Sequence, residues 1–156
     1  MDTITFQDVG PGDEAGLFQL FSAVRGEELG MQDWDPAVRR QMLQLQFEAQ
    51  RRSYREQFPA ADERLILRDG SRIGWVIVDR SGADLHGIDI ALLSSERSKG
   101  VGTRIIRALQ EEAAALSRPM VITVQRMNVQ ALALYRRLDF RVIEETDLHT
   151  VLEWRR

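Results

Sequence analysis

Residues 96–104 read Glu-Arg-Ser-Lys-Gly-Val-Gly-Thr-Arg and join an apolar run at residues 88–93 to the start of a helical pattern. Gly100 and Gly102 allow a close backbone approach to a ligand and positive φ values. The unpaired N–H groups and the positive dipole end of the following helix point to the same place. The flanking side chains add positive charge and one hydroxyl donor: Arg97, Lys99, Arg104 and Thr103. The junction therefore predicts an anion site, for which a phosphate group is the natural ligand.

The loop alone leaves the kind of ligand open. It lacks the Gly-Lys-Ser/Thr ending of a nucleotide-hydrolysing P-loop. It also lacks the third glycine of the dinucleotide fingerprint, and it follows several strands instead of opening a βαβ unit. A phosphate-binding loop and a simple capped helix start are equally good interpretations at this point.

The composition narrows the class of protein. The chain has 156 residues, of which 44% are hydrophobic and 29% charged, with a formal net charge of −3 and no cysteine. The charge argues against a nucleic-acid partner, and the missing cysteine excludes disulfides, thiolate metal ligands and a cysteine nucleophile. No signal peptide and no apolar run long enough to cross a bilayer is found. We expect one soluble cytoplasmic domain over residues 1–156, with no metal and no membrane partner.

The hydrophobic periodicity predicts the order of the elements. In chain order we expect a strand at 3–9, a helix from Asp13 to about 25, a helix at 36–57 capped by Asp35, three strands between 63 and 93 joined by tight turns at 69–70 and 81–82, a helix at 100–116, a strand at 120–124, a helix capped by Asn128, and two strands between 140 and 154. This order, β-α-α-β-β-β-α-β-α-β-β, predicts an α/β (α+β) fold with a mixed central sheet and helices on its faces.

A second motif changes the interpretation of the loop. Residues 124–140, VQRMNVQALALYRRLDF, carry a fixed series of residues: Asn128, Ala131, Leu134, Tyr135 and Phe140. With Arg97, Gly100 and Gly102, this series resembles the GNAT acetyltransferase superfamily, whose members have an Arg/Gln-x-x-Gly-x-Gly/Ala loop and a later Asn-x-x-Ala-x-x-Leu-Tyr-x-x-x-Gly-Phe motif. The chain departs from that pattern at Asp139, where glycine is usual, and at Ser94, where proline is common.

The resemblance implies that acetyl-CoA is the acyl donor. Its diphosphate would lie on the loop, and its pantetheine arm would pair with the end of the strand at 88–93, where the sheet splays from the strand at 120–124. A backbone N–H near Leu92 would then face the thioester oxygen. The residues implied to bind the donor are Ala91, Leu92, Leu93, Arg97, Ser98, Lys99, Gly100, Val101, Gly102, Thr103, Asn128 and Tyr135.

Tyr135 and Asp89 are the candidate catalytic residues. A phenol stays protonated at neutral pH and can donate to a leaving thiolate, as the matching tyrosine does in many GNAT members; the alternative is that Tyr135 only fills the core. Asp89 interrupts an apolar strand, which suggests either a general base or a carboxylate paired with an arginine. His86 and His149 are weaker candidates for the base.

The acceptor is the least determined part of the prediction. An amine, on a small molecule or on a protein, would attack the thioester directly, because the chain has no cysteine to form an acyl intermediate. The acidic stretch at residues 27–35 could steer a cationic amine, or its carboxylates could only stabilise helix ends. A homodimer is possible. The alternative function is a non-catalytic acyl-CoA sensor or partner module on the same fold.

Overall fold

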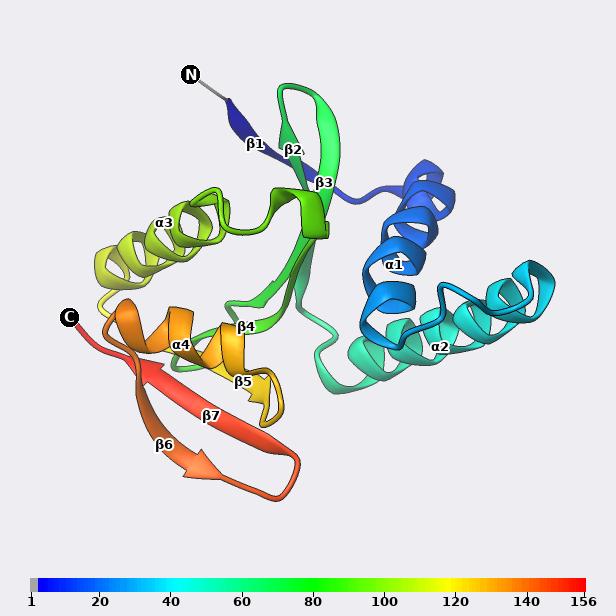
Figure 1. Cartoon of the computed structure of the whole chain (residues 1–156). Helices are drawn as coiled ribbons and strands as arrows, with labels where there is room; N and C mark the ends of the chain where they lie inside the picture. Colours follow the sequence, from blue (N-terminus) through cyan, green and yellow to red (C-terminus); the bar gives the residue numbers. More distant parts are fainter. Residues whose placement is uncertain (1–2) are drawn as a thin grey trace.

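A computed structural model describes residues 3–156 and contains one seven-stranded sheet (Figure 1). The strands lie in the order β1-β2-β3-β4-β5-β7-β6. Their bounds are β1 (Ile4–Asp8), β2 (Asp62–Arg68), β3 (Ser71–Asp79), β4 (Leu85–Leu92), β5 (Met120–Gln125), β6 (Arg141–Glu145) and β7 (His149–Trp154). The helices are α1 (Glu14–Glu28), α2 (Pro36–Gln57), α3 (Val101–Ala115) and α4 (Val129–Arg137), with short 3₁₀ turns at Pro11–Asp13 and Ser94–Glu96. The predicted element order is confirmed.

The helices form a layer on each face of the sheet, α1 and α2 on one face and α3 and α4 on the other (Figure 1). Strand residues alternate between the two layers, as the period of two requires. Leu65, Trp75, Ile77 and Ala91 pack with α1 and α2, whereas Ile66 and Val76 pack with α3 and α4. The sheet therefore separates two apolar cores.

The helix starts follow the predicted caps in two of three cases. The Asp35 carboxylate accepts from the Val38 N–H at 3.2 Å, and the Asn128 side-chain oxygen accepts from the Ala131 N–H at 3.1 Å. Asp13 stands at the N-cap of α1, but its carboxylate accepts from the Gly10 N–H at 2.8 Å, so it stabilises the preceding 3₁₀ turn instead.

One of the two predicted tight turns is wrong. Asp69 and Gly70 both have positive φ, 48° and 85°, as a two-residue hairpin turn needs. The second connection is longer, since β3 ends at Asp79 and β4 begins at Leu85. There the Asp79 carboxylate accepts from the N–H and the hydroxyl of Ser81 at 2.9 and 2.6 Å. This local turn competes with strand pairing and lengthens the loop.

The pairing between β4 and β5 is short and parallel, and it ends at Gly87, which lies opposite Ile122. On the other side, β4 pairs with β3, but the register shifts so that Ile77 faces Asp89 and Val78 faces Gly87. Ile88 is thus the extra residue of a β-bulge, which bends the strand. Residues 88–92, called here the unpaired β4 edge, consequently have no hydrogen-bonding partner strand on the β5 side.

The orientation of the backbone along the unpaired β4 edge follows from one hydrogen bond. The Leu93 N–H donates to the Ile73 carbonyl of β3 at 2.9 Å. Because successive residues of a strand direct their polar backbone groups to opposite sides, the N–H and carbonyl of Leu92 point away from β3. Unpaired backbone groups are therefore available where a strand-like ligand could bind.

Asp139 offers a test of the helix end. It follows Leu138, the C-cap residue of α4, and has a φ of 69°, in the left-handed region that glycine adopts without strain. We expect Asp139→Gly to stabilise the protein by about 1 kcal/mol, or about 2–4 °C in Tm, measured by thermal unfolding. Asp84→Gly, in a loop without positive φ, is the control and should lower Tm. An Asp139→Gly variant that is less stable than the wild type would show that the positive φ of Asp139 does not strain the backbone.

Candidate active site

The loop before α3 presents free backbone donors. Gly100 is the N-cap of α3 with a φ of 80°, and Ser98 also has a positive φ, 61°. The helical ladder starts with the Arg104 N–H, which donates to the Gly100 carbonyl at 3.1 Å. The N–H groups of residues 101–103 therefore lack a partner within the helix, and no side chain caps them. A β-carbon on Gly100 would meet nothing within 4 Å, so the space in front of the loop is open.

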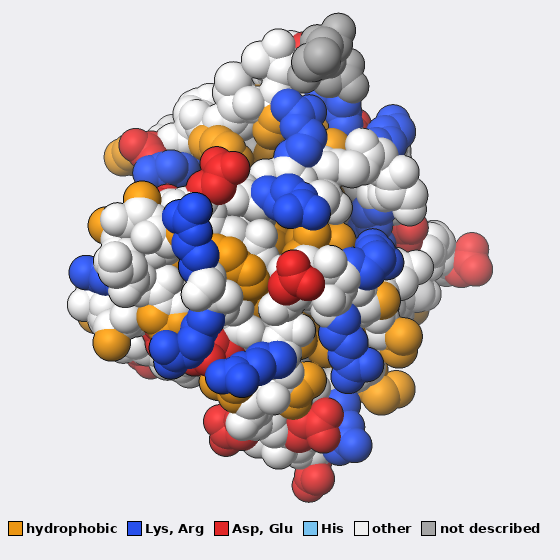
Figure 2. Space-filling model, turned by 90° about the vertical axis from the view of Figure 1, so that its left-hand side faces the viewer, with side chains coloured by type: hydrophobic (Ala, Val, Ile, Leu, Met, Phe, Trp, Pro, Cys, Tyr) orange, Lys and Arg blue, Asp and Glu red, His pale blue; other side chains and the backbone are white. Residues whose placement is uncertain are grey.

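Positive charge gathers at this loop. Residues 97–107 carry four cationic side chains and no acidic one, in a chain whose net charge is −3: Arg97, Lys99, Arg104 and Arg107. Lys and Arg side chains are prominent on the face of the molecule that bears α3 and α4 (Figure 2). Glu96, next to the loop, is held by Arg68, whose Nε donates to it at 2.8 Å. The loop thus combines helix N–H donors with an excess of cations, which suits a diphosphate.

The predicted strand residues lie beside the loop. Leu92, whose polar backbone groups point to the unpaired side, has its side chain on the α3/α4 face. Ala91 and Leu93 have their side chains on the α1/α2 face. Val101 is buried in the core under the loop, and Gly102 lies against Leu134 of α4. The loop follows the unpaired β4 edge along the chain, and α4 packs beside the loop through Leu134.

Tyr135 lies on the sheet-facing side of α4 and is 7% exposed. Its ring centroid is 5.5 Å from that of Phe140. Within residues 3–156 its hydroxyl makes no hydrogen bond. Burial, and then the Asp89 carboxylate, raise the pKa of Tyr135 to about 12. Since α4 covers one face and Asp89 points to the other, this influence acts across the sheet beside the unpaired β4 edge.

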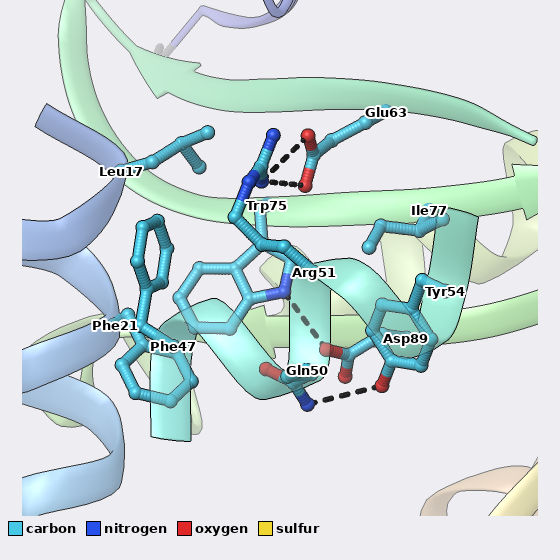
Figure 3. Close-up of a pocket in the computed structure, with 10 residues that line it drawn as sticks. All are labelled: Leu17, Phe21, Phe47, Gln50, Arg51, Tyr54, Glu63, Trp75, Ile77 and Asp89. Atoms are coloured by element: carbon cyan, nitrogen blue, oxygen red, sulfur yellow. Dashed lines mark hydrogen bonds and ion pairs between the residues drawn. The ribbon is translucent and has the colours of Figure 1, made fainter. Parts of the chain in front are cut away.

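Asp89 is held in a polar nest on the α1/α2 face (Figure 3). Its Oδ2 accepts from the Trp75 indole N–H at 3.0 Å and lies 3.5 Å from Nη2 of Arg25. The side chain is 12% exposed. Burial raises the pKa of Asp89, while the Arg25 guanidinium and the Trp75 indole oppose this rise and Glu28 adds to it. A carboxylate with a raised pKa accepts a proton more readily than an exposed one.

A small cavity lies next to Asp89. It leaves about 20 Å³ for the centre of a water molecule, enough for one water. Aromatic and polar side chains of α1, α2 and β3 line it, among them Phe21, Phe47, Gln50 and Tyr54. The Tyr54 hydroxyl accepts from the Gln50 amide at 3.1 Å and faces Asp89 (Figure 3). Burial and the Asp89 carboxylate raise the pKa of Tyr54, which stays protonated.

The other predicted polar residues lie elsewhere. His86 is three residues before Asp89, about 10 Å along the strand, and its ring packs edge-on against Phe58. His149 is exposed at the start of β7. Asn128 caps α4, which by itself explains its presence. Of the acidic stretch, Asp35 caps α2, and Glu28 forms ion pairs with Arg25 and Arg97.

Three residues of the nest were not predicted: Arg25, Tyr54 and Trp75. The position of Trp75 could have been inferred from strand pairing. Asp89 lies opposite Ile77 in the β3–β4 hairpin, and Trp75, two residues before Ile77, has its side chain on the same face. Arg25 and Tyr54 come from helices far away in the sequence, and their distance from Asp89 depends on how α1 and α2 pack on the sheet.

Within residues 3–156, no cluster of three or more His, Asp or Glu side chains could hold a metal ion. None of the helices in the same range is both long enough and apolar enough for a membrane span.

Comparisons with known proteins define the class. The model of the Acetyltransferase (GNAT) family matches residues 27–140, most of the chain, so this protein belongs to the GNAT acetyltransferase family. Membership implies acyl transfer from an acyl-CoA. The resemblance inferred from the two motifs is confirmed. No curated protein matches significantly.

Solved structures share the fold at low sequence identity. The PaiA N-acetyltransferase of Thermoplasma acidophilum, in complex with coenzyme A, has a TM-score of 0.75 and 10% identity over 99% of both chains. An acetyltransferase of Thermus thermophilus has a TM-score of 0.68 and 18% identity over 97% of this chain and 96% of its own. The ribosomal-protein-S18-alanine N-acetyltransferase of Escherichia coli has a TM-score of 0.64 and 14% identity over 97% and 92%. The mixed α/β fold prediction is confirmed.

The raised pKa of Asp89 has a consequence for stability. A folded-state pKa above the unfolded value of about 3.9 means that the folded protein binds this proton more tightly, so this group stabilises at low pH and loses that effect as pH rises through the folded pKa. We expect Asp89→Asn to unfold at pH 7 at a Tm equal to or above that of the wild type. In this variant the amide oxygen of the new side chain can still accept the hydrogen bond from the Trp75 indole, and Arg25 retains its ion pair with Glu28.

The measurement is thermal unfolding of both proteins across roughly pH 4–8. The advantage of Asp89→Asn should shrink as the pH falls, because the wild-type carboxyl becomes neutral. A variant that is less stable than the wild type at pH 7, with a deficit that does not change with pH, would contradict a raised pKa.

Proposed function

We propose that this protein transfers an acetyl group from acetyl-CoA to an amine by direct attack, as one domain over residues 1–156. The observation that carries the proposal is the arrangement at the unpaired β4 edge, where a cationic loop with free N–H donors lies next to a buried carboxylate on the opposite face of the sheet. An amine approaching from the α1/α2 face would meet a donor held on the α3/α4 face. The acceptor is a small molecule or a protein, and its amine is the feature that the chemistry requires.

Acetyl-CoA supplies an activated thioester carbonyl. The N–H groups of Val101, Gly102 and Thr103 would bind its diphosphate, with Arg97, Ser98 and Lys99 at the rim. The free backbone N–H and carbonyl of Leu92 would bind the amides of its pantetheine arm in the manner of a β-strand. Ala91 and Leu93, whose polar backbone groups face β3, would flank this contact, and Asn128 would lie at the far side. The residues present fit this donor, because the polar groups of Leu92 point to the unpaired side and a β-carbon on Gly100 would meet open space.

Asp89 is the proposed general base. The amine nitrogen forms a bond to the acetyl carbonyl carbon. Its surplus proton passes to the Asp89 carboxylate, either directly or through a water molecule in the small cavity beside Asp89. The raised pKa suits this role, since it brings the proton affinity of the carboxylate nearer to the working pH. The N–H of Leu92 would stabilise the negative charge that develops on the carbonyl oxygen.

Tyr135 is the proposed general acid. When the bond between carbon and sulfur breaks, the leaving thiolate takes the hydroxyl proton of Tyr135, and the phenolate regains a proton from solvent. A pKa of about 12 keeps this hydroxyl protonated throughout the physiological range. A hydroxyl without a partner within residues 3–156 is free to donate to a substrate atom.

One observation favours a second candidate function, a non-catalytic acyl-CoA sensor. One oxygen of Asp89, Oδ2, is already engaged by both Trp75 and Arg25, as in a purely structural carboxylate. Both functions require acyl-CoA binding, and only the enzyme requires Tyr135 and Asp89 for turnover.

Donor binding is tested by calorimetric titration with CoA. We expect micromolar affinity, reduced by at least about 30-fold, or 2 kcal/mol, in Gly100→Glu, because a side chain strains the positive φ and a carboxylate repels the diphosphate. Gly82→Glu is the matched control, since it adds the same side chain in open space on a distant loop. Wild-type protein that binds no CoA, or equal losses in both variants, would contradict the site.

Turnover is tested by thiol release from acetyl-CoA with a panel of amines: a polyamine, a free amino acid and a peptide with a free N-terminus. We expect Tyr135→Phe and Asp89→Asn each to lower kcat by about 10²–10⁴-fold, with CoA affinity within about threefold of wild type. The wild-type profile should lack a descending limb from Tyr135 below about pH 10. CoA binding without turnover of any amine would favour the sensor.

A further inference from the structure

Four charged side chains connect the donor loop with the buried carboxylate. Nη2 of Arg25 lies 3.5 Å from Asp89, and its Nη1 lies 2.7 Å from Oε2 of Glu28. The other carboxylate oxygen of Glu28, Oε1, lies 3.7 Å from Nη2 of Arg97. Charges alternate along this ionic chain of Arg97, Glu28, Arg25 and Asp89, so each inner member is shared between two partners of opposite sign.

The strength of the links changes from the surface inward. The side chains of Arg97 and Glu28 are each 39% exposed, that of Arg25 is 23% exposed and that of Asp89 is 12% exposed. An exposed pair at 3.7 Å, without a hydrogen bond, is weak and easily broken. The inner pairs are better shielded from water, so a change in their charges is less screened.

Arg97 has a second anion to bind when the proposed donor is present. It lies in the cationic loop, and a diphosphate offers a guanidinium stronger, multiply charged acceptors than one carboxylate does. If Arg97 turns to the diphosphate, Glu28 keeps Arg25 as its sole cation. The shared guanidinium is then drawn toward Glu28, and its hold on Asp89 weakens.

We propose that Arg25 and Glu28 are positioning residues that transmit donor binding to Asp89, so that this carboxylate is released to accept a proton only when acyl-CoA occupies the loop. This inference rests on the proposed function, because it takes Arg97 as a donor contact and Asp89 as the base. It explains why a catalytic carboxylate would be engaged by an arginine in the free protein. It also gives the last turn of α1, which ends at Glu28, a role: this turn makes the release of Asp89 depend on prior binding of the donor.

The groups that face Asp89 come from several elements. Arg25 and Glu28 project from α1, Tyr54 from α2, the neutral indole of Trp75 from β3, and Tyr135 acts on it from α4. Both tyrosines have raised pKa values and stay neutral. Arg51 of α2 and Glu63 of β2 also line the cavity beside Asp89, but these two charges pair with each other, at 2.9 and 3.0 Å. Arg25 and Glu28 are therefore the charged groups that act on Asp89, and of the two only Glu28 also contacts the donor loop.

The test is proton uptake on CoA binding, measured by calorimetry of the whole chain in buffers of different ionisation enthalpy across roughly pH 5–8. Weakening of the Arg25 contact raises the proton affinity of Asp89, so CoA binding should draw protons into the wild-type protein. Asp89→Asn removes the proton uptake that is due to Asp89, so this variant measures the protons taken up or released by CoA itself. We expect Glu28→Gln to lose at least half of the Asp89-dependent uptake and to bind CoA roughly 2- to 5-fold tighter, since Arg97 is no longer held back.

Glu27→Gln is the matched control, because Glu27 precedes Glu28 on α1 and forms no ion pair within residues 3–156; it should keep the full uptake. Arg97→Gln should lower the uptake even where CoA still binds. Equal uptake in wild type, Asp89→Asn and Glu28→Gln, with CoA bound in all three, would overturn the inference and leave the proposed function intact. A wild-type protein that binds no CoA would overturn both.

Discussion

Hydrogen bonding between β4 and β5 stops at Gly87, and the organisation of the site depends on that loss of pairing. A continuous sheet would separate the α1/α2 layer from the α3/α4 layer, and no group on one face could act on the other. The bulge at Ile88 bends β4 away while β3 still supports its other edge. Backbone donors that a sheet interior would satisfy are left free beside Asp89, and the loop before α3 follows directly.

The fold was predictable because its signals are local. Periodicity, the caps at Asp35 and Asn128, and two motifs with fixed spacing require only neighbouring residues to be read. The prediction of a tight turn at residues 81–82 was wrong, because the Asp79 side chain forms a competing local turn with Ser81. The surroundings of Asp89 could be predicted only in part, because strand register reaches Trp75, whereas the position of Arg25 depends on packing between distant elements.

Asp89 is costly to the fold at neutral pH, since burial disfavours its charge and its partners compensate only in part. Replacing such a nest by apolar side chains would serve stability as well or better. Its presence on a strand whose neighbours are Ile88 and Ile90 is therefore better explained by chemistry than by folding. Tyr135 is also a largely buried residue, and its hydroxyl makes no hydrogen bond within residues 3–156, so packing alone does not require that group.

The covalent path from Asp89 to Arg97 follows the end of β4 and a 3₁₀ turn, and its side chains point to both faces of the sheet. The ionic path is different, because it leaves the sheet and returns through the last turn of α1. Because side chains of α1 contact both the loop and the carboxylate, a change of charge at Arg97 or at Asp89 alters the ion pairs of this helix. For this reason α1, which carries none of the family's sequence motifs, is the element in which donor and acceptor sites can influence each other.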